Sequence, residues 1–379
     1  MHICFLAWDF PDKNESTGGI GVFVKGLARA LILRGHQVSV ISQSKKNTAY
    51  THVDEGIEVW RIIVGKTPFL GTLQNAFRIS AALKKIDKKS AIDIVETSET
   101  QGAFIPKLTH AKHIVRLHGG HLFFANAENR KSRAFRKWIE HRTLLQANRI
   151  VSVSDYVFKE TMRLHNLNLD AKIIRNAITI VDQKHYTHAF EQTFLFVGWI
   201  VPKKGILNLL EAFFMLADEF PTANLVLAGR SGVNAENDKF WQEEYEAMIP
   251  PKLKQRITFL GALPNDLIPV LMQKSRVIVL PSLMEALPMA WLEALASGRP
   301  LIATNILPAL EIIENGVDGL LVPPNDSKAL NEKMRWSLLN EEKANAIGLK
   351  GRLKIEREFS MQKAVLENEN FYSNLITST

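Results

Sequence analysis

Two glutamates, Glu285 and Glu293, stand in the otherwise apolar stretch EALPMAWLE. Ser282 and Glu285 have the Ser-x-x-Glu spacing of a helix capping box. Pro288 argues against that role, because proline is tolerated at the first position of a helix and disrupts a helix interior. The sequence therefore predicts a helix that starts at Pro288, with Glu285 in the loop before it.

Glu293 falls about one and a half turns into this predicted helix, among residues that are almost all apolar. A helix that is apolar on every side is buried. A buried carboxylate without donors costs several kcal/mol, so Glu293 needs hydrogen-bond partners. Two kinds of partner fit equally well: an arginine or backbone amides of the protein, or the two hydroxyls of a vicinal diol such as a ribose.

A histidine and a glycine-rich segment each follow a predicted strand. His118 closes the run HIVRLH before Gly119 and Gly120, where a histidine serves either a ligand or the structure. The segment TGGIG, Thr17 to Gly21, follows the first predicted strand. Glycines in such a loop let backbone amides approach a phosphate or a sugar, although a plain turn is the alternative.

The elements that must position these residues repeat one rhythm in both halves of the chain. Short apolar runs alternate with longer helical patterns, which is typical of a parallel sheet built from βαβ units. The runs include ICFLAW, VSVIS, IDIVET and HIVRLH in the first half, and FLFVG, NLVLAG, RITFLG, VIVLPS and LIAT in the second. The sequence therefore predicts an α/β protein with two Rossmann-like parallel-sheet domains facing a cleft, and ligands bound beyond the carboxyl ends of the strands.

Length and composition agree with two globular domains. The chain has 379 residues, more than one hydrophobic core usually supports, and 46% of them are hydrophobic. Cys4 is the only cysteine, which excludes a disulfide framework and fits a reducing, cytoplasmic compartment. The first residues lack a basic segment and predict a buried strand rather than a secretory signal. The net charge of +8 suggests an anionic partner.

The segment PSLMEALPMAWLEALASGRPLIAT resembles the retaining glycosyltransferases of family 4, which have the GT-B fold. Their signature is a glutamate, seven residues and a second glutamate, preceded by Pro-Ser. Similar stretches extend the resemblance over essentially the whole chain: EIIENGVDGLLVPPND, RITFLGALP, FVGWIVPKKG, the TGGIG loop and the closing REFSMQKAV. It implies an N-terminal acceptor domain (1–188), a C-terminal donor domain (189–355) and a final helix (356–379) that packs on the N-terminal domain.

The resemblance also implies roles for individual residues. Glu293 would bind the ribose of the nucleotide, and Glu285 the hydroxyls of the donor sugar. Backbone amides near Met289 and Ala290, at a helix N-terminus, would face the diphosphate or sugar. Lys204 matches the lysine that contacts the diphosphate. Gly18, Gly19 and His118 match N-terminal positions near the transfer site.

Two positions depart from the family pattern. Trp199 stands where an arginine usually contacts the diphosphate, so one cation is missing unless Arg230 or Lys203 replaces it. Leu307 and Pro308 stand where many relatives have Gly-Gly, which puts loop contacts there in doubt.

The chain contains no Asp-x-Asp and no His/Asp/Glu cluster with metal spacing, so the sequence predicts a metal-independent reaction. Family members are thought to react on one face of the sugar, with the leaving phosphate helping to take the proton of the acceptor. No cofactor is expected; the donor would be a UDP- or GDP-linked sugar.

A basic amphipathic helix is predicted over 126–149. It carries seven Lys or Arg residues against two glutamates, with Phe135, Trp138, Ile139 and Leu145 on an apolar side. Such a helix can lie on an anionic membrane, which suits a lipid-linked acceptor and a peripheral location; a solvated basic face is the alternative.

We therefore expect a retaining, hexosyltransferase-type glycosyltransferase that moves a sugar from a nucleotide diphosphate sugar to a glycan, lipid-linked or small-molecule hydroxyl. Two alternatives are a nucleotide-sugar epimerase of the same fold and a sugar-nucleotide-binding protein with weakened turnover. A nucleic-acid partner is not expected, because the basic segment lacks a recognition module.

Overall fold

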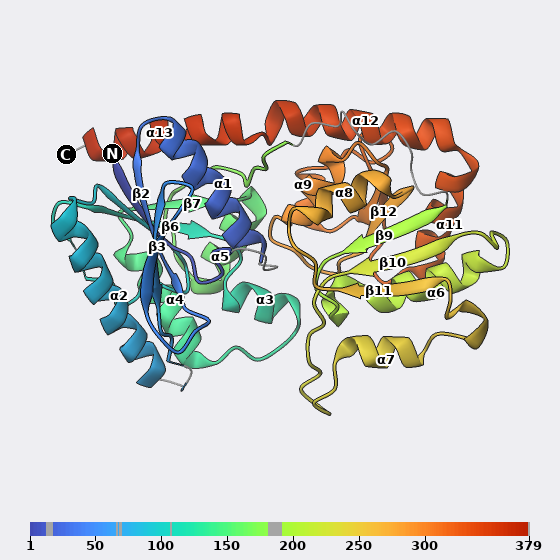
Figure 1. Ribbon diagram of the computed structural model, residues 1–379, viewed down its shortest axis with the longest axis horizontal. Helices are drawn as coiled ribbons and strands as arrows, with labels where there is room; N and C mark the ends of the chain where they lie inside the picture. The colour runs from blue at the N-terminus through green and yellow to red at the C-terminus, as the bar shows by residue number, and fades with distance from the viewer. Residues whose placement is uncertain (13–17, 66, 68–69, 107, 181–191, 378–379) are drawn as a thin grey trace. The chain divides into compact units, whose positions relative to one another are not determined.

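The computed structural model describes residues 1–12, 18–65, 67, 70–106, 108–180 and 192–377 (Figure 1). The chain forms two compact units. Unit 1 consists of the described parts of 1–12, 17–179 and 361–379, and unit 2 of those of 180–360. The predicted boundary at 188/189 lies outside the described residues. The predicted boundary at 355/356 falls inside a helix of unit 2, α12 (Glu341–Glu358).

Unit 1 is built on a sheet with the strand order β3-β4-β2-β1-β5-β6-β7-β8. All neighbouring strands are parallel except β3 and β4. The order reverses between β1 and β5, and this switch point is where open α/β sheets bind ligands. The strands are β1 (His2–Leu6), β2 (Gln37–Gln43), β3 (Tyr50–Asp54), β4 (Ile57–Ile62), β5 (Ile94–Ser98), β6 (Lys112–Leu117), β7 (Arg149–Ser152) and β8 (Ala171–Ile173).

The helices of unit 1 connect or cover these strands. The C-terminal helix, α13 (Met361–Thr377), packs against α1 (Gly19–Leu33), so the last residues of the chain lie beside the first helix (Figure 1). The others are α2 (Leu70–Lys89), α3 (His121–Ala127), α4 (Ala134–Gln146) and α5 (Asp155–His165). Buried aliphatic residues of α2 join those of β1, β2 and β5 in one hydrophobic cluster.

One strand pair departs from the predicted parallel rhythm. β3 and β4 are antiparallel and are joined by Glu55 and Gly56, whose φ angles are 51° and 84°. Two consecutive positive φ angles are typical of the tight turn that suits the twist of a hairpin. A parallel connection would have needed a longer crossover.

The prediction of one continuous basic helix over 126–149 was wrong. α3 ends at Ala127, and α4 begins only at Ala134. Asn129 has a φ of 49°, a left-handed conformation that ends the helical hydrogen-bond pattern. Residues 128–133, which carry three of the basic side chains, therefore form a loop between two helices.

Unit 2 is the second predicted parallel-sheet domain, and its strand order is β11-β10-β9-β12-β13-β14. Its strands are β9 (Thr193–Val197), β10 (Asn224–Ala228), β11 (Ile257–Gly261), β12 (Val277–Leu280), β13 (Leu301–Thr304) and β14 (Leu320–Val322). The order reverses between β9 and β12. The α/β prediction with two parallel-sheet domains is therefore confirmed.

Helices on the two faces of this sheet bury its strands. α6 packs against α11, and α9 packs against α12 and β13. The helical elements are η1 (Pro202–Lys204), α6 (Ile206–Ala217), α7 (Trp241–Ala247), η2 (Pro251–Leu253), α8 (Leu267–Lys274), α9 (Met289–Ala296), α10 (Leu307–Leu310), α11 (Ser327–Leu339) and α12. The described chain contains no helix that is long and apolar enough to cross a membrane.

Candidate active site

The loop before α9 is fixed to the turn after β9. Gly205 follows η1 with a φ of 72°, and a Cβ there would lie 2.0 Å from the carbonyl oxygen of Pro281. The backbone amide of Leu283 donates to the carbonyl of Lys203 at 2.8 Å. Glycine is required at 205 because the two segments approach so closely. This contact brings two predicted site residues, Lys204 and Glu285, together.

Lys204 and Glu285 form an ion pair through Nζ and Oε1, and both side chains are largely buried. The sequence predicted a contact of each residue with the donor but not their contact with each other. Glu285 lies in the loop before α9, as the position of Pro288 predicts, since α9 runs from Met289 to Ala296 with Pro288 as its N-cap. The amides of Met289 and Ala290 are in the first turn, where a helix leaves N–H groups without internal acceptors.

Glu293 lies one turn further along α9 and is half-buried. In the described part of the chain no donor contacts its carboxylate. Burial alone raises the pKa of Glu293 to about 7. Of the two partners that the sequence left open, a protein donor is therefore not found within unit 2, and a ligand with two hydroxyls still fits.

Trp199 and Arg230 lie side by side at the ends of β9 and β10. The amide of Ile200 donates to the carbonyl of Arg230 at 2.9 Å, which ties the two strand ends together. Trp199 is 51% exposed, and the guanidinium carbon of Arg230 lies 6.0 Å from its ring centroid. A cation therefore stands next to the position where the usual arginine is replaced by tryptophan.

In unit 1, Gly18 and Gly19 lie at the N-terminus of α1; Thr17 is outside the described residues. Gly18 is the N-cap with an extended conformation, and a Cβ there would meet nothing closer than 3.4 Å. Gly21 differs, because its Cβ would lie 1.9 Å from the carbonyl oxygen of Asp9. The glycine that this turn needs sterically is thus Gly21, which the sequence did not single out.

His118 follows β6 and lines a pocket of about 170 Å³ at the carboxyl ends of β1 and β5. Apolar side chains such as Leu6 and Val24 share this pocket with the polar residues Thr97, Ser98, Thr100 and Gln101. The imidazole is only 9% exposed. Burial, with a smaller effect from the charge of Arg116, lowers the pKa of His118 to about 3. His118 is therefore a neutral hydrogen-bonding group at neutral pH.

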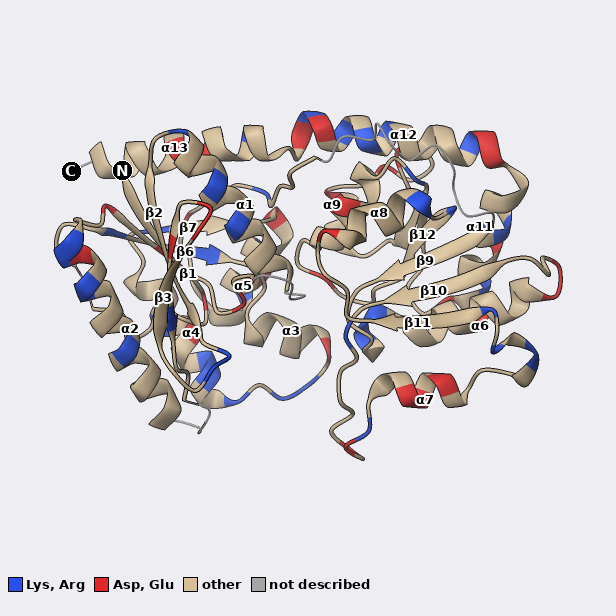
Figure 2. Cartoon of the chain, in the orientation of Figure 1, with Lys and Arg blue, Asp and Glu red and all other residues tan. Residues whose placement is uncertain are grey.

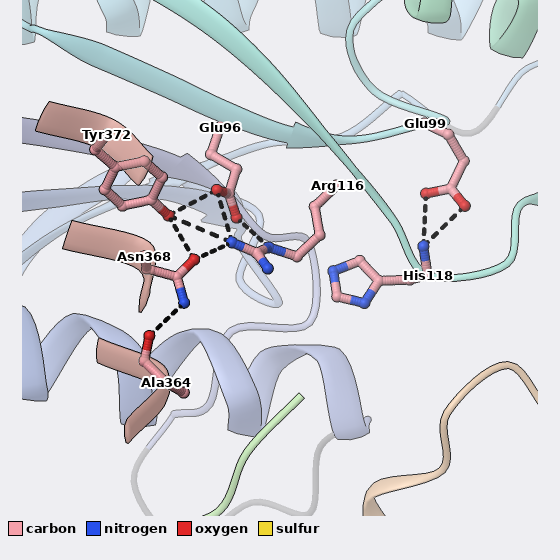
Figure 3. Close-up of polar contacts among 7 residues, drawn as sticks. All are labelled: Glu96, Glu99, Arg116, His118, Ala364, Asn368 and Tyr372. Atoms are coloured by element: carbon pink, nitrogen blue, oxygen red, sulfur yellow. Dashed lines mark hydrogen bonds and ion pairs between the residues drawn. The ribbon is translucent and has the colours of Figure 1, made fainter. Parts of the chain in front are cut away.

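Behind His118, a buried ion pair between β5 and β6 is hydrogen-bonded to α13 (Figure 3). Arg116 donates from Nε to Glu96 at 2.7 Å, and Tyr372 donates to the same carboxylate at 2.7 Å. Asn368 accepts a hydrogen bond from Arg116. The sequence reasoning missed this network, although a glutamate and an arginine inside the apolar strands β5 and β6 were a signal for it.

The predicted site residues thus fall into two groups. Unit 2 carries Lys204, Arg230, Glu285, Met289, Ala290 and Glu293 beyond the carboxyl ends of β9, β10 and β12, and unit 1 carries Gly18, Gly19 and His118. Within the described ranges, no group of three or more His, Cys, Asp or Glu side chains is arranged to hold a metal ion.

Two family models match the chain. Residues 17–180 match the model described as Glycosyltransferase Family 4, and residues 181–354 match Glycosyl transferases group 1. The chain is 23% identical to an uncharacterized glycosyltransferase of Methanocaldococcus jannaschii, with 87% of each protein covered. It is 26% identical to the UDP-Gal:alpha-D-GlcNAc-diphosphoundecaprenol alpha-1,3-galactosyltransferase of Escherichia coli, over 78% of this chain and 79% of that protein.

Solved structures show the same fold. The sucrose-phosphate synthase of Thermosynechococcus elongatus superposes with a TM-score of 0.82 at 18% identity, with 100% of both chains covered. The two parallel-sheet domains, together with matches to both halves of the chain, define a glycosyltransferase with the GT-B fold. The chain belongs to the family-4 type of these enzymes, as the resemblance implied.

Proposed function

We propose that this glycosyltransferase uses a nucleoside diphosphate sugar and transfers the sugar with retention of its anomeric configuration. The observation that carries the proposal is the carboxylate of Glu293, which is half-buried and has no donor among the described residues. A ribose diol supplies two hydroxyl donors to the two oxygens of a carboxylate. On binding, the hydroxyls would stabilise the charged form of Glu293.

The diphosphate would lie at the N-terminus of α9. The first-turn amides of Met289 and Ala290 and the partial positive charge of the helix favour an anion there. Lys204 contacts Glu285 and would be shared with the diphosphate when donor binds. Arg230 would supply the second cation beside Trp199. These groups would stabilise the leaving diphosphate without a metal ion.

Glu285 would hold the hydroxyls of the donor sugar rather than attack it. Its ion pair with Lys204 lowers its nucleophilicity and fixes its orientation. Retention would then follow from attack by the acceptor hydroxyl on the face that the phosphate leaves, with the phosphate taking the proton. His118 would donate or accept a hydrogen bond as a neutral imidazole, since its pKa of about 3 excludes the role of a general acid at neutral pH.

The acceptor hydroxyl would enter from unit 1, at the pocket beside His118. Its lining combines hydroxyl groups of Thr97, Ser98 and Thr100 with apolar side chains and the charged Asp9, Glu96 and Arg116, which suits a hydroxyl-rich glycan. The Escherichia coli relative is named for a diphosphoundecaprenol acceptor and a UDP-linked donor, which favours UDP as the nucleotide, with GDP as the alternative, and a lipid-linked glycan as the acceptor.

A basic surface of unit 1 supports a lipid-linked acceptor. Lysines and arginines lie along the loop 128–133 and on α4 (Figure 2). Trp138 and Leu145 of α4 are 46% and 57% exposed. Basic residues with exposed apolar side chains bind anionic membranes at their surface, which would place the enzyme peripherally at the cytoplasmic face.

Anionic vesicles should therefore bind the protein at low salt, and a Trp138→Ala, Leu145→Ala variant should bind them less.

The first test is a thermal shift with UDP, GDP, ADP and their sugars on wild type and Glu293→Ala. A ligand that binds only the folded state raises the midpoint. One nucleotide should stabilise wild type and not the variant, while Glu219→Ala, at an exposed ion pair of unit 2, should respond like wild type. No response of wild type to any nucleotide would contradict the proposal. Product analysis with that donor then separates transfer from epimerisation and from binding without turnover.

A further inference from the structure

The turn that carries His118 is held by two buried carboxylates from other elements. Glu99, just after β5, accepts the backbone amide of His118 with both oxygens, at 3.0 and 3.3 Å (Figure 3). Glu140, on α4, accepts the amides of His121 and Leu122, the latter at 3.1 Å. Both glutamates are 2% exposed. Together they bind the backbone at both ends of the turn from 118 to 122.

Gly120 lies between the two carboxyl groups. A Cβ on Gly120 would lie 2.8 Å from Cγ of Glu99 and 2.9 Å from Oε1 of Glu140. The two side chains therefore face each other across the space that any other residue would fill. Because α3 is short and its N-cap is Gly120, Glu140 supplies the acceptor that a capping side chain would normally provide.

A charge on one of two facing buried carboxyl groups disfavours a charge on the other. Burial first, and then the charge of Glu140, raise the pKa of Glu99 to about 8. The other titratable groups around the pair are His165 of α5, whose Nε2 lies 3.5 Å from Glu140, and His121, which contacts Arg136. His118 itself faces Arg116 of β6 and stays neutral.

We propose that Glu99 and Glu140 are positioning residues that hold the turn from His118 to Leu122 by its backbone amides, and so set where the His118 imidazole lies. The inference rests on the proposed function, because it concerns how His118 meets the substrates. The proton on the Glu99 carboxyl contributes to this positioning, because it keeps one of the two facing carboxyl groups uncharged. When Glu99 loses it, two like charges face each other across Gly120, and the turn is loosened.

The sign of the pH effect follows from the raised pKa. The protonated carboxyl of Glu99 is stabilised in the folded state, so the stability that it gives the turn is complete below the ordinary glutamate pKa of about 4.5 and is lost as the pH rises from there to about 8. Turnover should fall over the same range. In Glu99→Gln, the amide oxygen still accepts the His118 amide and no charge develops, so this fall should disappear.

The kinetic test compares wild type, Glu99→Gln, Glu99→Ala and a matched surface variant, Glu160→Gln, whose carboxylate pairs with Arg163 on α5. Glu99→Ala should lower kcat by about tenfold to a hundredfold through misplacement of His118, with the KM for the donor changed less. Glu99→Gln should have at least the kcat of wild type at pH 7 and lose the fall that wild type shows up to about pH 8. Glu160→Gln should keep the profile of wild type. Identical profiles in wild type and Glu99→Gln would overturn the proposal.

Amide hydrogen exchange of residues 118–122 provides a test that does not depend on activity. In wild type, protection should fall from about pH 4.5 to about pH 8 by more than the chemical exchange rate explains, and in Glu99→Gln it should not. Equal protection in both proteins would overturn the positioning role even if transfer occurs. If wild type and Glu99→Gln differ in exchange as expected but the protein transfers no sugar, the proposed function is contradicted. The positioning of the turn by the two carboxyl groups is then still supported.

Discussion

Glu293 has a half-buried carboxylate that no donor contacts in the described part of the chain. Its pKa of about 7 lies above that of an exposed glutamate, so the folded state loses stability as the pH rises from about 4.5 to 7. Replacement by glutamine removes the charge and nearly keeps the shape. Glu293→Gln should therefore raise the free energy of unfolding at pH 8 by about 1–2 kcal/mol, a value reduced for partial exposure of the side chain.

Urea unfolding at pH 5 and pH 8 measures this difference. The gain should shrink towards pH 5, and the same variant should bind the stabilising nucleotide at least tenfold more weakly. A variant that is less stable than wild type at pH 8 would show that Glu293 has a protein donor after all.

Arg230 is a cation beside the tryptophan that replaces an arginine. If it contacts the diphosphate, Arg230→Ala should raise the KM for the nucleotide sugar by about tenfold, which corresponds to the loss of one charge-assisted hydrogen bond. Trp199→Phe keeps an aromatic face under the guanidinium and should change KM little. Steady-state kinetics with the identified donor provides the comparison, and an unchanged KM in Arg230→Ala would exclude the contact.

At the scale of elements, the turn from β1 into α1 depends on one glycine. Gly21→Ala should destabilise the protein by about 2–4 kcal/mol, because its Cβ would overlap the carbonyl of Asp9 and α1 must shift. Gly18→Ala is the matched control: its Cβ meets nothing closer than 3.4 Å, so the variant should lose only the small N-cap preference for glycine and be destabilised much less than Gly21→Ala. Thermal unfolding of both variants distinguishes them, and equal midpoints would contradict this account of the turn.

The sequence was sufficient to predict those strands and helices that are encoded by neighbouring residues. Buried strands appear as apolar runs, and Pro288 located the start of α9 to within one residue. The β3–β4 hairpin was missed because β3 is polar and mostly unburied, and the end of α3 was missed because it depends on the left-handed conformation of Asn129. The contacts Lys204–Glu285 and Glu99–His118 join residues far apart in the chain, so spacing could not predict them.

At the scale of the whole molecule, α13 completes unit 1. Tyr372→Phe removes a donor from the buried carboxylate of Glu96 and should lower the free energy of unfolding by about 1–3 kcal/mol. Chemical denaturation measures this loss of stability, with the unfolding of unit 1 as the observed signal. Phe371→Tyr, a half-buried neighbour outside the network, should change stability by less than Tyr372→Phe; equal effects would contradict the role of the hydroxyl.

The return of α13 to unit 1 has a consequence for synthesis on the ribosome. Residues 1–179 leave the exit tunnel first, yet Arg116 and Glu96 obtain Asn368 and Tyr372 only when the last turns of the chain emerge. Unit 2, whose described segments are continuous from 192 to 360, has no such delay. The half of the protein that is translated first is therefore the half that finishes folding last, and until then its polar strand residues need water or a chaperone.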